Sequence, residues 1–177
     1  MIISEKVNLN IDKNIDIINI LLNHTENLHE QGFFKEFEKI ILIKKTQSNN
    51  IIETIRKAII KTVLPKFIMD LIPIDIQNNF NQFKEFSIWD IENKIWSFEY
   101  KPISNIQLYT LEGFCIINNS TILIKLDFNI IQKISFQELI EKTIIQVIMN
   151  NLKKIFKELE NKKLHKLIPV KTITYSI

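Results

Sequence analysis

A stretch near the C-terminus, "ISFQELIEKTIIQVIMNNLKKIFKELENKKL" (residues 134–164), carries the longest helical pattern in the chain. Its apolar residues recur at steps of three and four, the spacing of one face of an α-helix. They are Leu139, Ile140, Ile144, Val147, Ile148, Leu152, Ile155, Phe156 and Leu159. Ser135 and Glu138 have the spacing of a capping box, in which each side chain bonds a free backbone N–H. The stretch therefore predicts one helix of about 25 residues or more, with an apolar stripe too wide to cover only the edge of a core.

The residues before this helix are rich in β-strand patterns. The strand before the helix alternates, with Ile122, Ile124, Leu126, Phe128 and Ile130 on one face and Lys125, Asp127 and Asn129 on the other. Asparagine-containing turns separate successive candidates, as expected for hairpins. The candidate strands are residues 1–10, 37–46, 50–64, 80–91, 93–103, 105–117 and 120–131.

Two short helices are expected between the first two strands. Residues 11–23 have apolar residues at helical spacing, and either Asp12 or Asn14 can cap them. Residues 24–34 predict a second helix that ends near Gly32, where glycine permits a left-handed turn.

Sequential hairpins with helices outside them predict an α+β fold with an antiparallel sheet. A sheet with one apolar face needs a cover, and the last helix is the only element long enough to provide it. We therefore expect a sheet of about six to seven strands wrapped around that helix. No repeat or linker divides the chain, so residues 1–164 are expected to form one domain, and residues 165–177 a tail or an added strand.

Composition excludes several classes of protein. The 177 residues carry a net charge of +3 and one arginine, which argues against nucleic-acid binding. The single cysteine, Cys115, permits no internal disulfide and favours a reducing compartment. The chain has no run of 18 apolar residues and no secretory-signal pattern, so we expect a cytoplasmic protein.

The order of these elements resembles the helix-grip fold of START-like and polyketide-cyclase-like proteins (the SRPBCC superfamily), in an uncharacterised bacterial branch. The resemblance covers roughly residues 1–164 and includes Trp89 at a strand end, Gly113 within a strand, and a strand that runs into "IQKISFQELIEKTI". Ser135, Phe136 and Gln137 stand where relatives often have a proline and glycines. The resemblance implies a mainly apolar cavity between sheet and helix. Relatives bind lipids, sterols, quinones or polyketides there, and some instead serve as protein-interaction modules.

We therefore expect a non-enzymatic binder or carrier of a hydrophobic, lipid-like molecule, without a cofactor or metal. The expected cavity has a volume of a few hundred Å³, on the order of small-molecule sites. Its walls are expected to be Trp96, Phe98, Tyr100, Ile122, Ile124, Leu126, Phe128, Ile140, Ile144, Val147 and Ile148. The alternative is a co-chaperone-like module with a filled core. A weaker alternative is an enzyme that uses a cavity group such as Glu112 or Tyr109.

The segment "LPKFIMDLIP" (residues 64–73) is the candidate gate of the cavity, through Phe67, Met69 and Leu71. Its prolines limit hydrogen bonding to neighbouring elements. Its apolar side chains could also touch a membrane surface, and peripheral membrane contact is therefore an alternative role for this segment. A buried connector is the competing interpretation.

Three other constellations remain. The group His24, Glu26, His29 and Glu30 could suggest a metal, but histidines five residues apart do not share a helix face. Cys115 is interpreted as a small core residue. Arg56 would need a carboxylate partner such as Glu112 if it pointed inward, and a solvent-facing Arg56 is favoured because long charged side chains are seldom buried.

Overall fold

The computed structural model describes residues 1–11, 15–61, 64–72, 74, 82–103, 109–118, 120–131 and 133–167. A seven-stranded antiparallel sheet forms one layer, with the strand order β1-β7-β6-β5-β4-β3-β2. The strands are β1 (Ile2–Asn8), β2 (Phe37–Ser48), β3 (Ile51–Ile60), β4 (Gln82–Asp90), β5 (Ile95–Pro102), β6 (Tyr109–Asn118) and β7 (Thr121–Ile130). The prediction of an α+β fold with sequential antiparallel hairpins is confirmed, and β1 returns to pair with β7.

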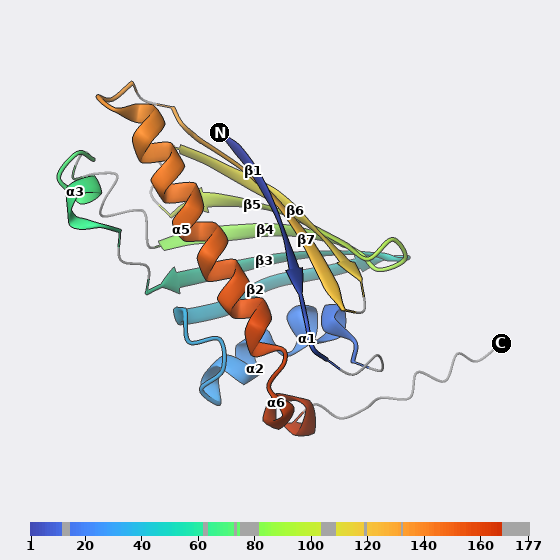
Figure 1. Cartoon of the computed structure of the whole chain (residues 1–177). Helices are drawn as coiled ribbons and strands as arrows, with labels where there is room; N and C mark the ends of the chain where they lie inside the picture. Colours follow the sequence, from blue (N-terminus) through green and yellow to red (C-terminus); the bar gives the residue numbers. More distant parts are fainter. Residues whose placement is uncertain are drawn as a thin grey trace.

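One long helix lies across one face of this sheet, and most of the short helices lie near its C-terminal end (Figure 1). The helices are α1 (Ile17–Asn23), α2 (Thr25–Glu30), α3 (Lys66–Met69), α5 (Gln137–Glu158) and α6 (Lys162–Leu167). In the described part of the chain, no helix is long and apolar enough to cross a membrane.

The two N-terminal helices form where they were expected, but the first has a different cap. The side chain of Asp16 accepts a hydrogen bond from the backbone N–H of Asn19 at 3.0 Å, so Asp16 is the N-cap of α1. The predicted caps, Asp12 and Asn14, fall outside the described residues. Gly32 follows α2 with a φ of +87°, which is the left-handed turn predicted for it.

The prediction of one unbroken helix over residues 134–164 is wrong. Helix α5 has 22 residues and ends at Glu158, and α6 is a separate element that begins at Lys162. The intervening N–H groups of Leu159, Glu160 and Asn161 bond three residues back, which tightens and ends the helix. The Asn161 side chain then accepts from the N–H of Lys163 at 3.0 Å and so caps a new helix.

The predicted capping box at the start of α5 is also wrong. Its N-cap is Phe136, which has a left-handed backbone (φ 58°, ψ 28°) and makes no side-chain cap bond. Ser135 lies one residue too early, because the chain turns sharply between β7 and α5.

The face of the sheet toward α5, called the inner face here, holds the core. Inward side chains of β7 such as Ile122, Ile124 and Leu126 are fully buried, as are Ile140 and Ile144 of α5. Polar residues of β7 alternate with them on the opposite, outer face. The amphipathic pattern predicted for this strand and helix is therefore confirmed, except that Leu139 of the predicted stripe is exposed.

Gly113 of β6 has close neighbours on the inner face. A Cβ atom built on it would lie 2.5 Å from the carbonyl oxygen of Lys125 and 2.8 Å from Cζ of Phe98. Both distances are shorter than a van der Waals contact, so only glycine fits there without a shift.

The predicted C-terminal tail begins inside a helix. Residues 165–167 belong to α6, and residues 168–177 lie outside the described part of the chain.

Candidate functional site

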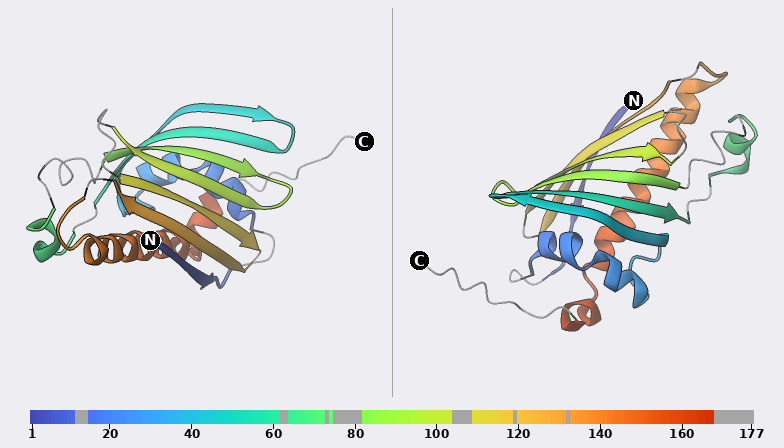
Figure 2. Two further views of the ribbon diagram at one scale, coloured as in Figure 1. Left: turned by 90° about the horizontal axis from the view of Figure 1, so that it is seen from above. Right: turned by 180° about the vertical axis from the view of Figure 1, so that it is seen from behind.

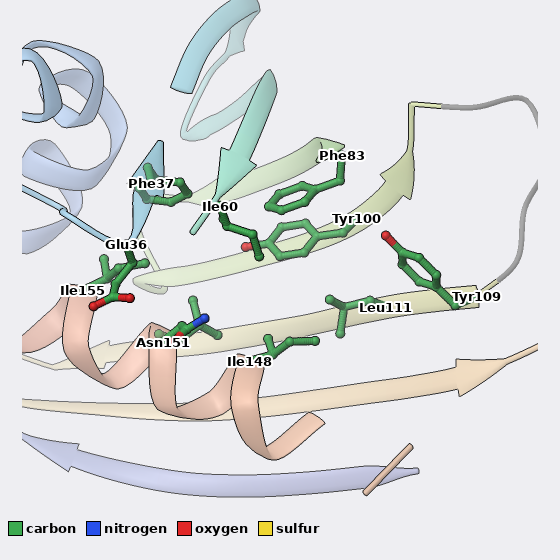
Figure 3. Close-up of a pocket in the computed structure, with 11 residues that line it drawn as sticks. Glu36, Phe37, Ile60, Phe83, Tyr100, Tyr109, Leu111, Ile148, Asn151 and Ile155 are labelled. Atoms are coloured by element: carbon green, nitrogen blue, oxygen red, sulfur yellow. The ribbon is translucent and has the colours of Figure 1, made fainter. Parts of the chain in front are cut away.

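The candidate site is a pocket between the middle of α5 and one end of the sheet (Figure 3). Its walls come from the start of β2, the end of β3, the start of β4, the end of β5, the start of β6 and the inner face of α5. The lining residues are Glu36, Phe37, Ile60, Phe83, Tyr100, Tyr109, Leu111, Ile148, Asn151, Leu152 and Ile155. The pocket is partly open to solvent, and its volume of about 40 Å³ is far below the few hundred Å³ expected from the sequence.

The pocket is mainly apolar, with a few polar groups at its margins. In the view of Figure 3, Glu36 and Asn151 lie at one side and Tyr109 at the other. The Glu36 carboxylate lies 3.5 Å from Nζ of Lys154, which compensates its charge. Burial raises the pKa of Tyr109 well above its ordinary value, so this hydroxyl stays protonated at neutral pH.

Of the cavity wall predicted from the sequence, Tyr100 and Ile148 line this pocket. The other predicted wall residues pack into the core. These are Trp96, Phe98, Ile122, Ile124, Leu126, Phe128, Ile140 and Ile144, with Val147 half-buried against them. The middle of the sheet is therefore filled by side chains, and the free space is displaced to the strand ends.

Several pocket residues were missed because they lie at element ends. Phe37 is the first residue of β2, Phe83 is the second of β4, and Ile60 is the last of β3, where alternation is too short to show a face. Leu152 and Ile155 belong to the apolar stripe predicted for the last helix. That stripe could therefore have identified them as pocket residues.

The candidate gate contains α3, which connects β3 to β4, the strands that supply Ile60 and Phe83 to the pocket. Phe67 is 56 % exposed, whereas Ile68 is fully buried in the same hydrophobic cluster as the core. Met69 and Leu71 pack partly against that cluster. The segment thus combines an anchor on the core with an outward aromatic ring. Pro73 lies outside the described residues.

A second feature of the inner face is a buried charge network on β3 and β4. Arg56 is only 2 % exposed, and its Nε lies 2.7 Å from the Glu26 carboxylate of α2. Its Nη1 lies 3.4 Å from Glu85 of β4, and its Nη2 donates to the carbonyls of Leu21 and Leu22 at the end of α1. The favoured interpretation of a solvent-facing Arg56 is wrong, because these acceptors together compensate the cost of its burial.

The prediction that Glu112 is the carboxylate partner of Arg56 is also wrong. Glu112 is exposed on the outer face of β6, so it serves neither the arginine nor a cavity. Glu26 and Glu85 take the partner's place, and neither is near Arg56 in sequence. Glu26 was considered above only as part of a metal group. In the structure, its neighbour His29 places Nε2 3.0 Å from the carbonyl of Phe37.

The network continues toward the pocket through β4 and β5. The Ser87 hydroxyl donates to Glu85 at 2.7 Å and accepts from the indole N–H of Trp96 at 2.9 Å. Burial and then the nearby charge of Glu85, to which its hydroxyl is hydrogen-bonded, raise the pKa of Tyr100 well above its ordinary value. Tyr100 is therefore a pocket wall on one side and a member of the network on the other.

The charge balance of this network favours an ionised arginine. Burial alone would lower the pKa of Arg56, but the carboxylates of Glu85 and Glu26 outweigh it, so the pKa is raised. Every buried side-chain polar atom in the described part of the chain has a hydrogen-bond partner.

Cys115 lies fully buried on β6, as expected for a core residue. Burial, followed by the charge of Glu85, raises the pKa of its thiol well above the ordinary value. A protonated, inaccessible thiol is a poor nucleophile. Across the described residues, no three His, Cys, Asp or Glu side chains are grouped so that they could hold a metal ion.

Comparison with known proteins identifies the fold alone. No protein-family model matches the chain, and no curated protein matches it in sequence. A crystal structure of TTHA0849 from Thermus thermophilus is similar, with a TM-score of 0.53 over 94 % of this chain and 97 % of that chain. The two sequences are 13 % identical, so the likeness concerns the arrangement of elements.

Proposed function

We propose that this chain is a START-like helix-grip protein that binds a hydrophobic small molecule without transforming it. The observation that carries the proposal is the apolar pocket between α5 and the sheet end, bordered by Tyr109 and by Glu36 with Asn151. An apolar concavity with a few polar groups at its rim is the usual form of a small-molecule site. The single buried cysteine supports a cytoplasmic location.

The volume of the pocket limits how a ligand would bind. About 40 Å³ accommodates a few waters or the end of an acyl chain, but no whole lipid. A larger ligand would have to displace part of the lining. Residues 64–72, which include α3, are the proposed moving part, with Phe67, Met69 and Leu71 as the gate.

A membrane surface is the proposed source of the ligand. In Figure 1 and in both views of Figure 2, α3 lies beside the N-terminal end of α5. This end of the molecule carries exposed large apolar side chains from separate segments, namely Phe67 of α3, Ile131 after β7, and Phe136 and Leu139 at the start of α5. Such a group of exposed apolar side chains is typical of a surface that contacts a partner or a bilayer.

The filled middle of the core supports a second candidate function, a protein-interaction module without a ligand. Eight residues of the expected cavity wall are buried in the core and a ninth, Val147, packs against it, instead of lining the pocket. In that case the pocket is a packing defect and the exposed surfaces carry the activity.

Native mass spectrometry of gently purified protein, combined with binding of the fluorescent probe anilinonaphthalene sulfonate, separates the two. The binder should carry a co-purifying apolar molecule or bind the probe in the pocket. Ile148→Trp fills the pocket and should weaken probe binding at least tenfold. Lys142→Trp, on the same helix but exposed and outside both the pocket and the apolar group above, is the matched control. A wild-type protein that carries no molecule and binds no probe would favour the interaction module.

A further inference from the structure

The outer face of the sheet carries more apolar surface than a solvated face needs. In the view from behind, strands β3 to β7 are seen with α5 on their far side (Figure 2, right). Ile88 is 50 % exposed near the middle of this face, and Ile51 and Leu123 are exposed to either side of it. Phe86 and Phe114 are half-buried between them. Exposed apolar side chains that are contiguous across several strands indicate an interaction surface.

Like charges also stand directly opposite one another on this face. Lys57, Lys84 and Lys101 are neighbours across β3, β4 and β5. Glu99, Glu112 and Asp127 are neighbours across β5, β6 and β7, two residues away along the strands. Like charges placed opposite destabilise a sheet. Lys101 forms an ion pair with Glu99, and Asp127 forms one with the N-terminal amino group. In contrast, Lys57, Lys84 and Glu112 form no ion pair with any described residue.

The pattern is complementary to itself about an axis along β5. One row across the sheet runs Glu53, Ile88, Ser97, Phe114 and Lys125 from β3 to β7. A two-fold axis along β5 exchanges β3 with β7 and β4 with β6. It therefore places Glu53 of one copy over Lys125 of the other, and Ile88 over Phe114.

One neighbouring row matches about this axis directly, whereas the row of Ile55, Phe86, Glu99, Glu112 and Asp127 sets Glu99 over its own copy and the acidic side chains of β6 and β7 over Phe86 and Ile55. The row of Ile51, Asp90, Ile95, Ile116 and Leu123 would set Ile51 over Leu123 and Ile95 over itself. In the row of Lys57, Lys84 and Lys101, the axis would set Lys84 of one copy over β6 of the other and Lys57 over β7. These two lysines would then lie one row along the strands from Glu112 and Asp127 of the other copy. A row spacing of about 7 Å is within reach of a lysine side chain.

We propose that the outer face of β3–β7 is the interface of a two-fold symmetric dimer of this chain. A uniformly anionic surface fits less well, because the acidic row on β5–β7 would repel it. The five strands span roughly 600 Å² in projection, from strand spacing and residue rise. This area approaches the roughly 800 Å² per partner of a standard interface. Two sheets packed face to face is also a common arrangement.

Sedimentation equilibrium on the full chain, up to several hundred micromolar, tests the proposal. Wild type should dimerise, and more weakly at high salt because the charge pairs are screened. Ile88→Arg should weaken dimerisation at least tenfold. Lys142→Glu, an exposed charge change on α5, should leave it unchanged.

A charge-swap set makes the test specific to the axis. Glu53→Lys and Lys125→Glu should each weaken the dimer several-fold, since each brings like charges together twice. The double variant should recover most of the loss. A monomeric wild type, a dimer insensitive to Ile88→Arg, or a double variant no better than the single variants would overturn the proposal. Circular dichroism confirms that each variant is folded.

Discussion

Nε of Arg56 lies 2.7 Å from Oε1 of Glu26, and this contact joins the sheet to α2 across the core. The same guanidinium reaches the carbonyls at the end of α1. One side chain on β3 therefore fixes both N-terminal helices against the inner face. Because the network also holds Glu85 and Tyr100, the position of these helices is connected to one wall of the pocket.

Arg56→Met should lower the free energy of unfolding by about 3–5 kcal/mol, because it leaves Glu85 and Glu26 facing a site without a positive charge. Urea unfolding at neutral pH measures this. Lys142→Met, which removes an exposed lysine, should change the free energy of unfolding by less than about 0.5 kcal/mol. A loss below about 1 kcal/mol for Arg56→Met would mean that the network contributes little.

The free energy of unfolding should begin to fall as the pH rises above about 9, before the lysines lose their protons. In the folded chain, burial keeps the pKa of Cys115, Tyr100 and Tyr109 above their ordinary values of 9.0 and 10.0. In the unfolded chain these groups release protons near the ordinary values, so the unfolded state binds fewer protons above about pH 9 and is favoured there. Each group should cost about 1.4 kcal/mol per pH unit above its unfolded pKa.

Cys115→Ala isolates the contribution of the thiol to this loss of stability at alkaline pH. The variant will lose some stability at every pH because a side chain is shortened, so the slope of stability against pH is the useful quantity. Between about pH 9 and pH 10 that slope should be shallower than in wild type. Equal slopes would show that the thiol is ionised, or solvated, in the folded protein.

Gly113→Ala should lower the free energy of unfolding by about 1–3 kcal/mol, the usual cost of overpacking a core. The new methyl group would meet the backbone carbonyl of Lys125, which is held in the sheet and moves little. Gly32→Asn is the matched control, since a Cβ there meets no atom within 4 Å and asparagine tolerates a positive φ. Thermal unfolding of the two variants should rank them clearly, and equal losses would argue against the steric explanation.

The gate can be followed by amide hydrogen exchange over residues 66–72. The N–H groups of residues 68–72 donate to carbonyl oxygens of residues 65–69, which lie in the same segment. They should therefore exchange faster than those of β4 and β5, and vesicles containing anionic lipid should slow them. Protection equal to that of the strands, unchanged by vesicles, would identify the segment as a fixed connector.

The sequence predicted those features that repeat along the chain. Alternation in β7 and the three-to-four spacing in α5 each involve many residues, so single exceptions did not hide them. The end of α5 was missed because Leu159 is buried and continues the apolar stripe, although the backbone has already turned. A local turn that keeps an apolar residue inward leaves no mark on periodicity.

The candidate site was harder to predict because it depends on contacts between distant segments. Arg56 looked unsuited to the core until α2 and β4 supplied Glu26 and Glu85. The pocket lies at the strand ends, where the fit of Phe37, Phe83 and Leu152 decides how much space is left. Such differences in packing come from three-dimensional shape and not from residue type.

The pairing of β1 with β7 bears on how the chain is made. Ile2 lies opposite Asp127, so β1 finds its neighbour only after β7, at the far end of the sheet's sequence, has been synthesised. Hairpins β2–β3, β4–β5 and β6–β7 can form from local contacts, whereas β1 must wait with its apolar side unsatisfied. Closure of this edge should therefore be a late step in folding, and the interval before it the period in which the nascent chain is most exposed to chaperones and to aggregation.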